Sequence, residues 1–277
     1  MTTSATPRKG RCIRTGLCTA VLLAAGPLCA ADGDSDRDGN RDGASVGIGV
    51  DYSRGDYGGT LDTGIVSVPL SAQLRRGRWQ FGASLPWLRV SGDRNVLPTL
   101  GLLPGLGLAN APGAGTERTI TSGVGDLDLS AAYSVDTGGK LGIDLGAKAK
   151  IATADADRGL GTGANDYGIS VDLYRDVAGI LLFGGVGHAW LGDSPRIEAT
   201  TQQRANVGLA HRAGRGQLGL MYEQRSALVD QLEGRRDATA FYSLPTASGG
   251  RFKLYASHGQ SDGSPDWGAG VAVSAGF

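Results

Sequence analysis

The amino-acid sequence predicts an all-β fold: a transmembrane antiparallel up-and-down β-barrel of about 12 strands. Three observations predict it, namely an export signal, apolar residues at every second position, and connections that alternate between short and long. No stretch after residue 31 reaches the roughly 18 apolar residues of a membrane-spanning helix. A chain that crosses lipid without helices must close into a barrel, because only closure hydrogen-bonds every backbone group.

Residues 1–31 are the predicted signal peptide. Four basic residues between positions 8 and 14 precede an apolar run over 17–28, and small residues then allow cleavage after Ala30 or Ala31. All three cysteines fall in this segment, so the mature chain would have neither disulfides nor cysteine-ligated metal. It would keep 23 basic and 27 acidic residues, a balance that gives no case for binding nucleic acid.

Residues 32–43 form a predicted acidic, flexible leader without any apolar side chain. Asp34, Asp36, Asp38 and Gly39 match the first half of a calcium loop. The twelfth position of that loop is Ser45, where a bidentate Glu is required. We therefore interpret the leader as a solvated spacer and expect neither metal nor cofactor.

Residues 44–277 alternate between apolar and polar side chains, which predicts one barrel domain. Over 141–151, Leu, Ile, Leu, Ala, Ala and Ile alternate with Gly, Asp, Gly, Lys and Lys. Successive strand residues point to opposite faces, so each strand has one apolar and one polar face. Charges stand in mid-strand between Gly and Ala, which favours lipid outside and polar groups inside over the core of a soluble sandwich. The predicted strands are 44–53, 64–75, 78–90, 121–135, 140–153, 165–177, 180–191, 200–212, 217–227, 236–245, 251–260 and 267–277.

The connections between these strands alternate in length without exception. The short ones are 76–77, 136–139, 178–179, 214–216 and 246–250. The long ones are 54–63, 91–120, 154–164, 192–199, 228–235 and 261–266. Outer-membrane barrels have short periplasmic turns and long outer loops, so this alternation predicts the topology.

The final strand ends in Phe277, with Trp, Ala, Val, Val, Ala and Phe on one face. Such a strand resembles the C-terminal signal that the barrel-assembly machinery recognises, so Phe277 is the predicted assembly signal. Aromatic girdles at the two membrane interfaces are also expected. Their predicted members are Trp79, Trp87, Trp190, Trp267, Tyr133 and Tyr167.

Charged residues at the inward positions of the strands are candidates to line the lumen. They could select a permeating solute, or they could stabilise a polar interior through cross-strand ion pairs. The two roles can hold at once. The candidates are Asp51, Asp126, Asp128, Asp144, Lys148, Lys150, Asp172, Arg204, Glu223, Arg225 and Lys253.

The long connection 91–120 is rich in leucine, glycine and proline. An apolar loop of this size is unfavourable in water, so we expect it to fold into the barrel mouth or against the lipid interface. It either gates or contacts an apolar solute, or it is a plug that only closes the barrel. The gating candidates are Leu97, Leu100, Leu102, Leu103, Leu106 and Leu108.

Two other functions remain open from the sequence. His258 and Ser261 could serve an outer-membrane hydrolase of lipids or esters, but a spacing of three places them on opposite faces of a regular strand. The other alternative is a non-conducting structural or adhesive barrel.

Three segments, 123–129 (GVGDLDL), 150–155 (KIATAD) and 159–167 (GLGTGANDY), together resemble a known family. They are similar to the outer-membrane transporters labelled "MetA-pathway of phenol degradation", over residues 123–177. The family usually has Pro-Thr-Gly where this chain has Ala-Thr-Ala at 152–154. The resemblance implies an outer-membrane barrel linked to the passage of aromatic or other hydrophobic compounds, without established site residues.

The sequence therefore predicts a channel or transporter of the cell outer membrane for small, hydrophobic or aromatic molecules, with no catalytic residues. The expected partners are the lipid bilayer, the secretion and barrel-assembly machinery, and a small apolar solute.

Overall fold

The structure is a computed structural model that describes residues 42–59, 61–93, 96, 118–194, 199–228, 233–247 and 249–277. The regular elements among these residues are all strands. A helix long and apolar enough to cross a membrane does not occur in these ranges. The strands are β1 Gly43–Gly55, β2 Thr63–Arg76, β3 Trp79–Asp93, β4 Arg118–Val124, β5 Leu127–Val135, β6 Leu141–Ile151, β7 Asp166–Val177, β8 Ile180–Trp190, β9 Thr201–Ala213, β10 Gly216–Arg225, β11 Arg236–Pro245, β12 Arg251–Gly259 and β13 Trp267–Gly276.

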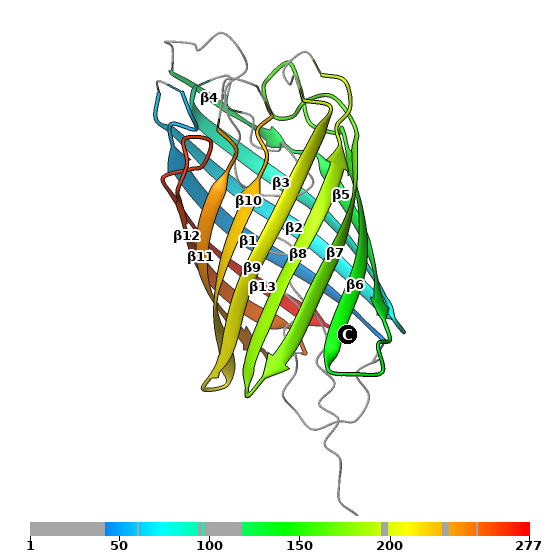
Figure 1. Ribbon diagram of the computed structural model, residues 1–277. Coiled ribbons are helices and arrows are strands. Elements are labelled where there is room, and N and C mark those ends of the chain that lie inside the picture. Colours follow the sequence, from blue (N-terminus) through cyan, green and yellow to red (C-terminus); the bar gives the residue numbers. More distant parts are fainter. Residues whose placement is uncertain are drawn as a thin grey trace, which may run out of the picture.

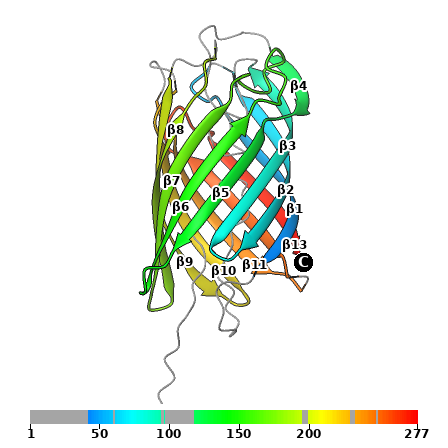
Figure 2. The ribbon, with the colours of Figure 1, turned by 90° about the vertical axis from the view of Figure 1, so that its right-hand side faces the viewer.

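Every strand is antiparallel to its sheet neighbours, and the sheet closes because β1 pairs with both β2 and β13. The tilted strands and their closure are visible in Figure 1 and, after a quarter turn, in Figure 2. β4 and β5 both pair with β3, so together they occupy one position in the wall. The described part of the chain is therefore a 12-stranded up-and-down barrel, as predicted.

The predicted strand 121–135 is interrupted, which corrects the sequence-based boundary. β4 ends at Val124 and β5 begins at Leu127. Between them, the Asp126 carboxylate accepts hydrogen bonds from the backbone N–H groups of Thr153 and Ala154, at 3.2 and 3.0 Å. The chain breaks its strand here because Asp126 bonds to the neighbouring connection instead of continuing the alternation.

The outer surface of the barrel is apolar. Side chains such as Val50, Leu70 and Val186 are 49–61% exposed, whereas the residues between them in sequence face the interior. Aromatic residues gather near both rims, where Trp79 lies 5.0 Å from Tyr133 and Trp267 lies 5.2 Å from Tyr52. This arrangement agrees with the predicted girdles.

The strand ends that short connections join all lie at one end of the barrel, and the strand ends that long connections join lie at the other (Figure 1). The turn between β7 and β8 is only two residues long. Ala178 and Gly179 both have positive φ, 54° and 84°, as a tight type I′ hairpin requires. Asp176 accepts a hydrogen bond from the Gly179 N–H at 3.1 Å, which stabilises this turn.

The seam between the first and last strands is closed by side chains as well as by backbone. Ala44 and Phe277 exchange two backbone hydrogen bonds of 3.0 and 2.9 Å. Inside the barrel, the Tyr255 hydroxyl of β12 donates to the Asp51 carboxylate of β1, passing over β13. The contact is possible because the intervening residue is Gly270, where a Cβ would collide with both groups. Asp51 is only 5% exposed, so this hydrogen bond is shielded from water.

We expect Tyr255→Phe to lower the free energy of unfolding by about 1–3 kcal/mol, because it leaves a buried carboxylate without its donor. Tyr167→Phe is the matched control, since Tyr167 is 53% exposed on the outer surface. Unfolding by urea in lipid vesicles, followed by tryptophan fluorescence, measures both variants. Equal midpoints for the two variants would show that the seam does not depend on this hydrogen bond.

Candidate functional site in the barrel interior

The eleven predicted lumen residues all lie on inward positions or, for Asp126, at the strand break. Three of them, Asp128, Lys148 and Arg204, are partly exposed. The other eight are at most 6% exposed: Asp51, Asp126, Asp144, Lys150, Asp172, Glu223, Arg225 and Lys253. The interior is therefore densely packed around its charges, and their individual partners differ in kind.

Lys150 is the centre of a closed ion-pair network near the long-loop end. Its ammonium lies 2.8 Å from Asp166 and 3.5 Å from Asp126, and it donates to the Thr162 hydroxyl at 2.7 Å. Asp166 also accepts from the Gly192 N–H at 3.0 Å. These contacts tie the connection 152–165 to the ends of three strands. Lys150 and Asp126 are thus structural residues, and Asp166, the second carboxylate beside Lys150, was not predicted from the sequence.

Two further ion pairs are buried at the outer ends of β10 and β11. Arg225 contacts Glu223 at 2.6 Å, and Arg235 contacts Asp237 at 2.9 Å. Each pair is separated by two residues, so both members face the interior. Both pairs join residues two positions apart in the chain, whereas the sequence had led us to expect ion pairs between strands.

Arg204 differs from these paired cations. None of the described carboxylates lies within 4.0 Å of its guanidinium group. A small cavity adjoins Arg204 and is also lined by Lys148, Ser170, Gln202 and Arg225. The charged interior therefore has one region where a cation faces open space.

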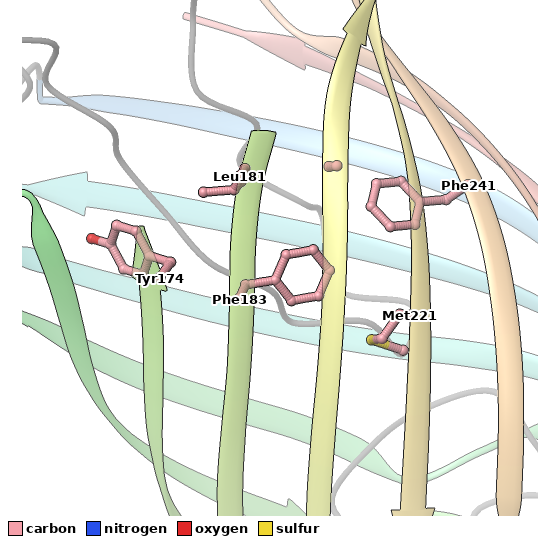
Figure 3. Close-up of a cluster of buried hydrophobic side chains, with 6 residues drawn as sticks. Tyr174, Leu181, Phe183, Met221 and Phe241 are labelled. Atoms are coloured by element: carbon pink, nitrogen blue, oxygen red, sulfur yellow. The ribbon is translucent and has the colours of Figure 1, made fainter. Parts of the chain in front are cut away.

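An apolar belt on the inner wall was not predicted. Tyr174, Leu181, Phe183, Met221 and Phe241 are 3–8% exposed and, with Ala210, form one cluster across β7 to β11 (Figure 3). We call these six residues the inner belt; Tyr255 packs against it. The signal was present at Ile180–Phe183, where both faces of a strand are apolar. We did not predict the inner belt because we assumed that apolar and polar residues alternate uniformly along every strand.

Rings of the inner belt lie flat against the wall because glycines stand beside them. Phe183 is directly opposite Gly208, and Phe241 is directly opposite Gly219. A Cβ at either glycine would collide with the ring. Tyr174 has the same relation to Gly142. These glycines let aromatic rings cover the neighbouring strand, which keeps the rings at the wall.

The outer mouth holds a second apolar cluster of Tyr57, Ile65, Val90 and Val96, all at most 6% exposed. Burial raises the pKa of Tyr57 to about 12, although a hydrogen bond to Ser53 partly offsets this rise. Val96 belongs to the long connection 91–120. The six leucines predicted to gate the channel lie outside the described residues, so their role remains a prediction.

His258 and Ser261 are not paired. The imidazole Nδ1 lies 2.8 Å from the Asp266 carbonyl oxygen, whereas the Ser261 hydroxyl donates to the Gly234 carbonyl at 2.8 Å. The serine proton is directed to the backbone, so this geometry does not support an activated nucleophile. Among the described residues no group of three metal-ligating side chains occurs either.

The barrel is similar to solved outer-membrane proteins. The COG4313 outer membrane channel from Pseudomonas putida F1 superposes with a TM-score of 0.66 at 14% identity, covering 88% of this chain and 100% of that chain. The NanC porin superposes with a TM-score of 0.50 at 9% identity, covering 84% of this chain and 98% of that chain. These likenesses concern the fold.

No family model and no curated protein matches the chain. The resemblance to the phenol-degradation family is therefore not confirmed and stays a prediction. The closed barrel, its apolar outer surface and the shared fold nevertheless show that the protein lies in the cell outer membrane.

We expect Lys150→Met to destabilise the barrel by about 3–5 kcal/mol, since two buried carboxylates lose their cation. The connection 152–165 should also become accessible to trypsin at Arg158. Lys140→Met, in an exposed turn, is the control. Urea unfolding and mass-spectrometric mapping of tryptic cuts provide the two measurements. Unchanged stability together with an intact Arg158 would contradict the structural role of Lys150.

Proposed function

We propose that the protein is a passive channel for small apolar or aromatic molecules. The inner belt carries this proposal, because a barrel that only needed a stable polar interior would not require six apolar side chains on its inner wall. Concave apolar surfaces with a few polar groups are typical of small-molecule sites.

Small residues on the opposite side of the barrel support the proposal. Strands β1 to β6 direct several glycines and serines inward, so the wall opposite the inner belt carries several small side chains. These inward residues include Gly47, Ser71, Gly82, Ser130 and Gly146. A solute would thus meet an apolar wall on one side and a small, polar wall on the other.

The polar groups between the two apolar clusters also fit a channel. Arg204, Lys148 and Asp172 face the interior between the mouth cluster and the inner belt. The solved structures of similar fold include proteins described as a channel and a porin, which supports the same class of function here.

The first test is ionic current through the purified full-length protein in a planar bilayer. We expect a steady conductance that p-cresol reduces in a concentration-dependent manner and that glucose does not. In the double variant Phe183→Gln, Phe241→Gln, half-block by p-cresol should require about tenfold more solute, because two aromatic contacts of roughly 0.5–1.5 kcal/mol each are lost.

The reductions of current by p-cresol and by glucose are compared within one protein preparation. Differences in the number of inserted channels therefore cancel. Block by p-cresol that is identical in the variant and the wild type would reject the belt as the solute's surface. A protein without any conductance would instead favour the structural or adhesive alternative.

We also propose that Phe277 is the feature that the barrel-assembly machinery recognises. Its side chain is 79% exposed on the outward face, while its backbone is held by Ala44. We expect Phe277→Ala to reduce the folded protein in the outer membrane several-fold. Phe252→Ala, at another outward position, is the control. Heat-modifiable migration of outer-membrane fractions measures the folded amount, and equal levels for both variants would contradict the proposal.

A further inference from the structure

Cationic and hydrogen-bonding side chains converge on one patch of the inner wall. In the register of the sheet, Ser170 of β7 lies opposite Gly187, Gly187 lies opposite Arg204, and Arg204 lies opposite Arg225. Lys148 of β6 faces the same patch and lines the same cavity. The cavity has a volume of about 40 Å³, enough for a group of a few atoms but not for a whole aromatic solute.

The cations around this cavity differ in their direct partners. Arg225 is neutralised by Glu223 at 2.6 Å, and Asp172 accepts a hydrogen bond from Ser170 at 3.1 Å. Arg204 has neither an ion pair nor a hydrogen bond with any residue in the described ranges. Asp172 attracts Arg204 without touching it, so the guanidinium group can still make direct, charge-assisted hydrogen bonds to an anion beside it.

The missing side chain at Gly187 makes the space. A Cβ atom there would lie 3.5 Å from the Arg204 Nε and 3.6 Å from the Ser170 Cβ. The Arg204 Nε therefore lies beside the bare backbone of Gly187. Gln202, 5% exposed, adds an amide to the same cavity.

The distance between this patch and the inner belt suits one extended solute that contacts both. Arg204 is four residues before Gly208 on β9, and the Phe183 ring covers Gly208. Four strand residues span roughly 13 Å. A solute with an anionic group at Arg204 and an apolar body of this length would reach the belt.

We propose that Arg204, assisted by Lys148 and Gln202, binds the carboxylate group of a solute whose apolar body rests on the inner belt. The inference rests on the proposed channel function and narrows its solutes to amphipathic carboxylates. A planar carboxylate suits a single guanidinium fork, which can donate two parallel hydrogen bonds to it.

The test compares 6-phenylhexanoate with 6-phenyl-1-hexanol as blockers of the current through the full-length protein. The two probes differ only in the charged end. We expect half-block by the carboxylate at a concentration about tenfold lower than by the alcohol, the gain of one charge-assisted contact. Arg204→Gln should abolish this difference while leaving block by the alcohol unchanged.

Arg212→Gln is the matched control, because Arg212 lies on the same strand but is exposed near the short-turn end. It should retain the preference for the carboxylate. Gly187→Leu keeps every charge and fills the space beside Arg204, so it should lose the preference as well. Heat-modifiable migration verifies that each variant is folded before it is measured.

A preference for the carboxylate that survives in Arg204→Gln would overturn the inference. Block by acetate at the same concentrations as 6-phenylhexanoate would also overturn it, since the apolar body would then contribute nothing. If the alcohol blocks the current and the carboxylate does so no better, only the carboxylate site fails. A wild-type protein that passes no current would overturn both this inference and the channel function.

Discussion

Backbone hydrogen bonding in lipid is the constraint on which the rest of this structure depends. A strand that crosses a membrane has no water to satisfy its N–H and C=O groups, so the sheet must close upon itself. Here closure brings β1 beside β13, where the backbones of Ala44 and Phe277 pair and the Asp51–Tyr255 hydrogen bond crosses the seam. Once the sheet is closed, successive side chains of a strand point alternately to the lipid and to the interior.

The charged residues of the interior have two roles. Lys150, Arg225 and Arg235 are held by carboxylates within 3 Å and fasten connections or strand ends. Arg204 is the contrasting case, with open space and no described carboxylate beside it. Buried charge pairs add little net stability but position the chain firmly, whereas a partly exposed cation without a direct partner can bind an anion.

Apolar groups in the interior are organised by glycine. Phe183 and Phe241 lie over Gly208 and Gly219, so their rings cover backbone that would otherwise face the lumen. This packing gives the inner wall apolar area without directing rings across the barrel. Together with the charged patch around Arg204, it makes the interior amphipathic, which suits solutes that have both an apolar body and a polar end.

The sequence by itself determined the architecture: alternation, loop lengths and final strand predicted twelve antiparallel strands and the inward parity of the charges, because strand geometry has a strict period of two. It did not determine which inward residues meet. Lys150 is 24 positions from its partner Asp126 and 16 from its partner Asp166, and the inner belt draws its side chains from five strands. Only the register and tilt of the closed barrel bring them together, so the functional surface was decided by tertiary structure.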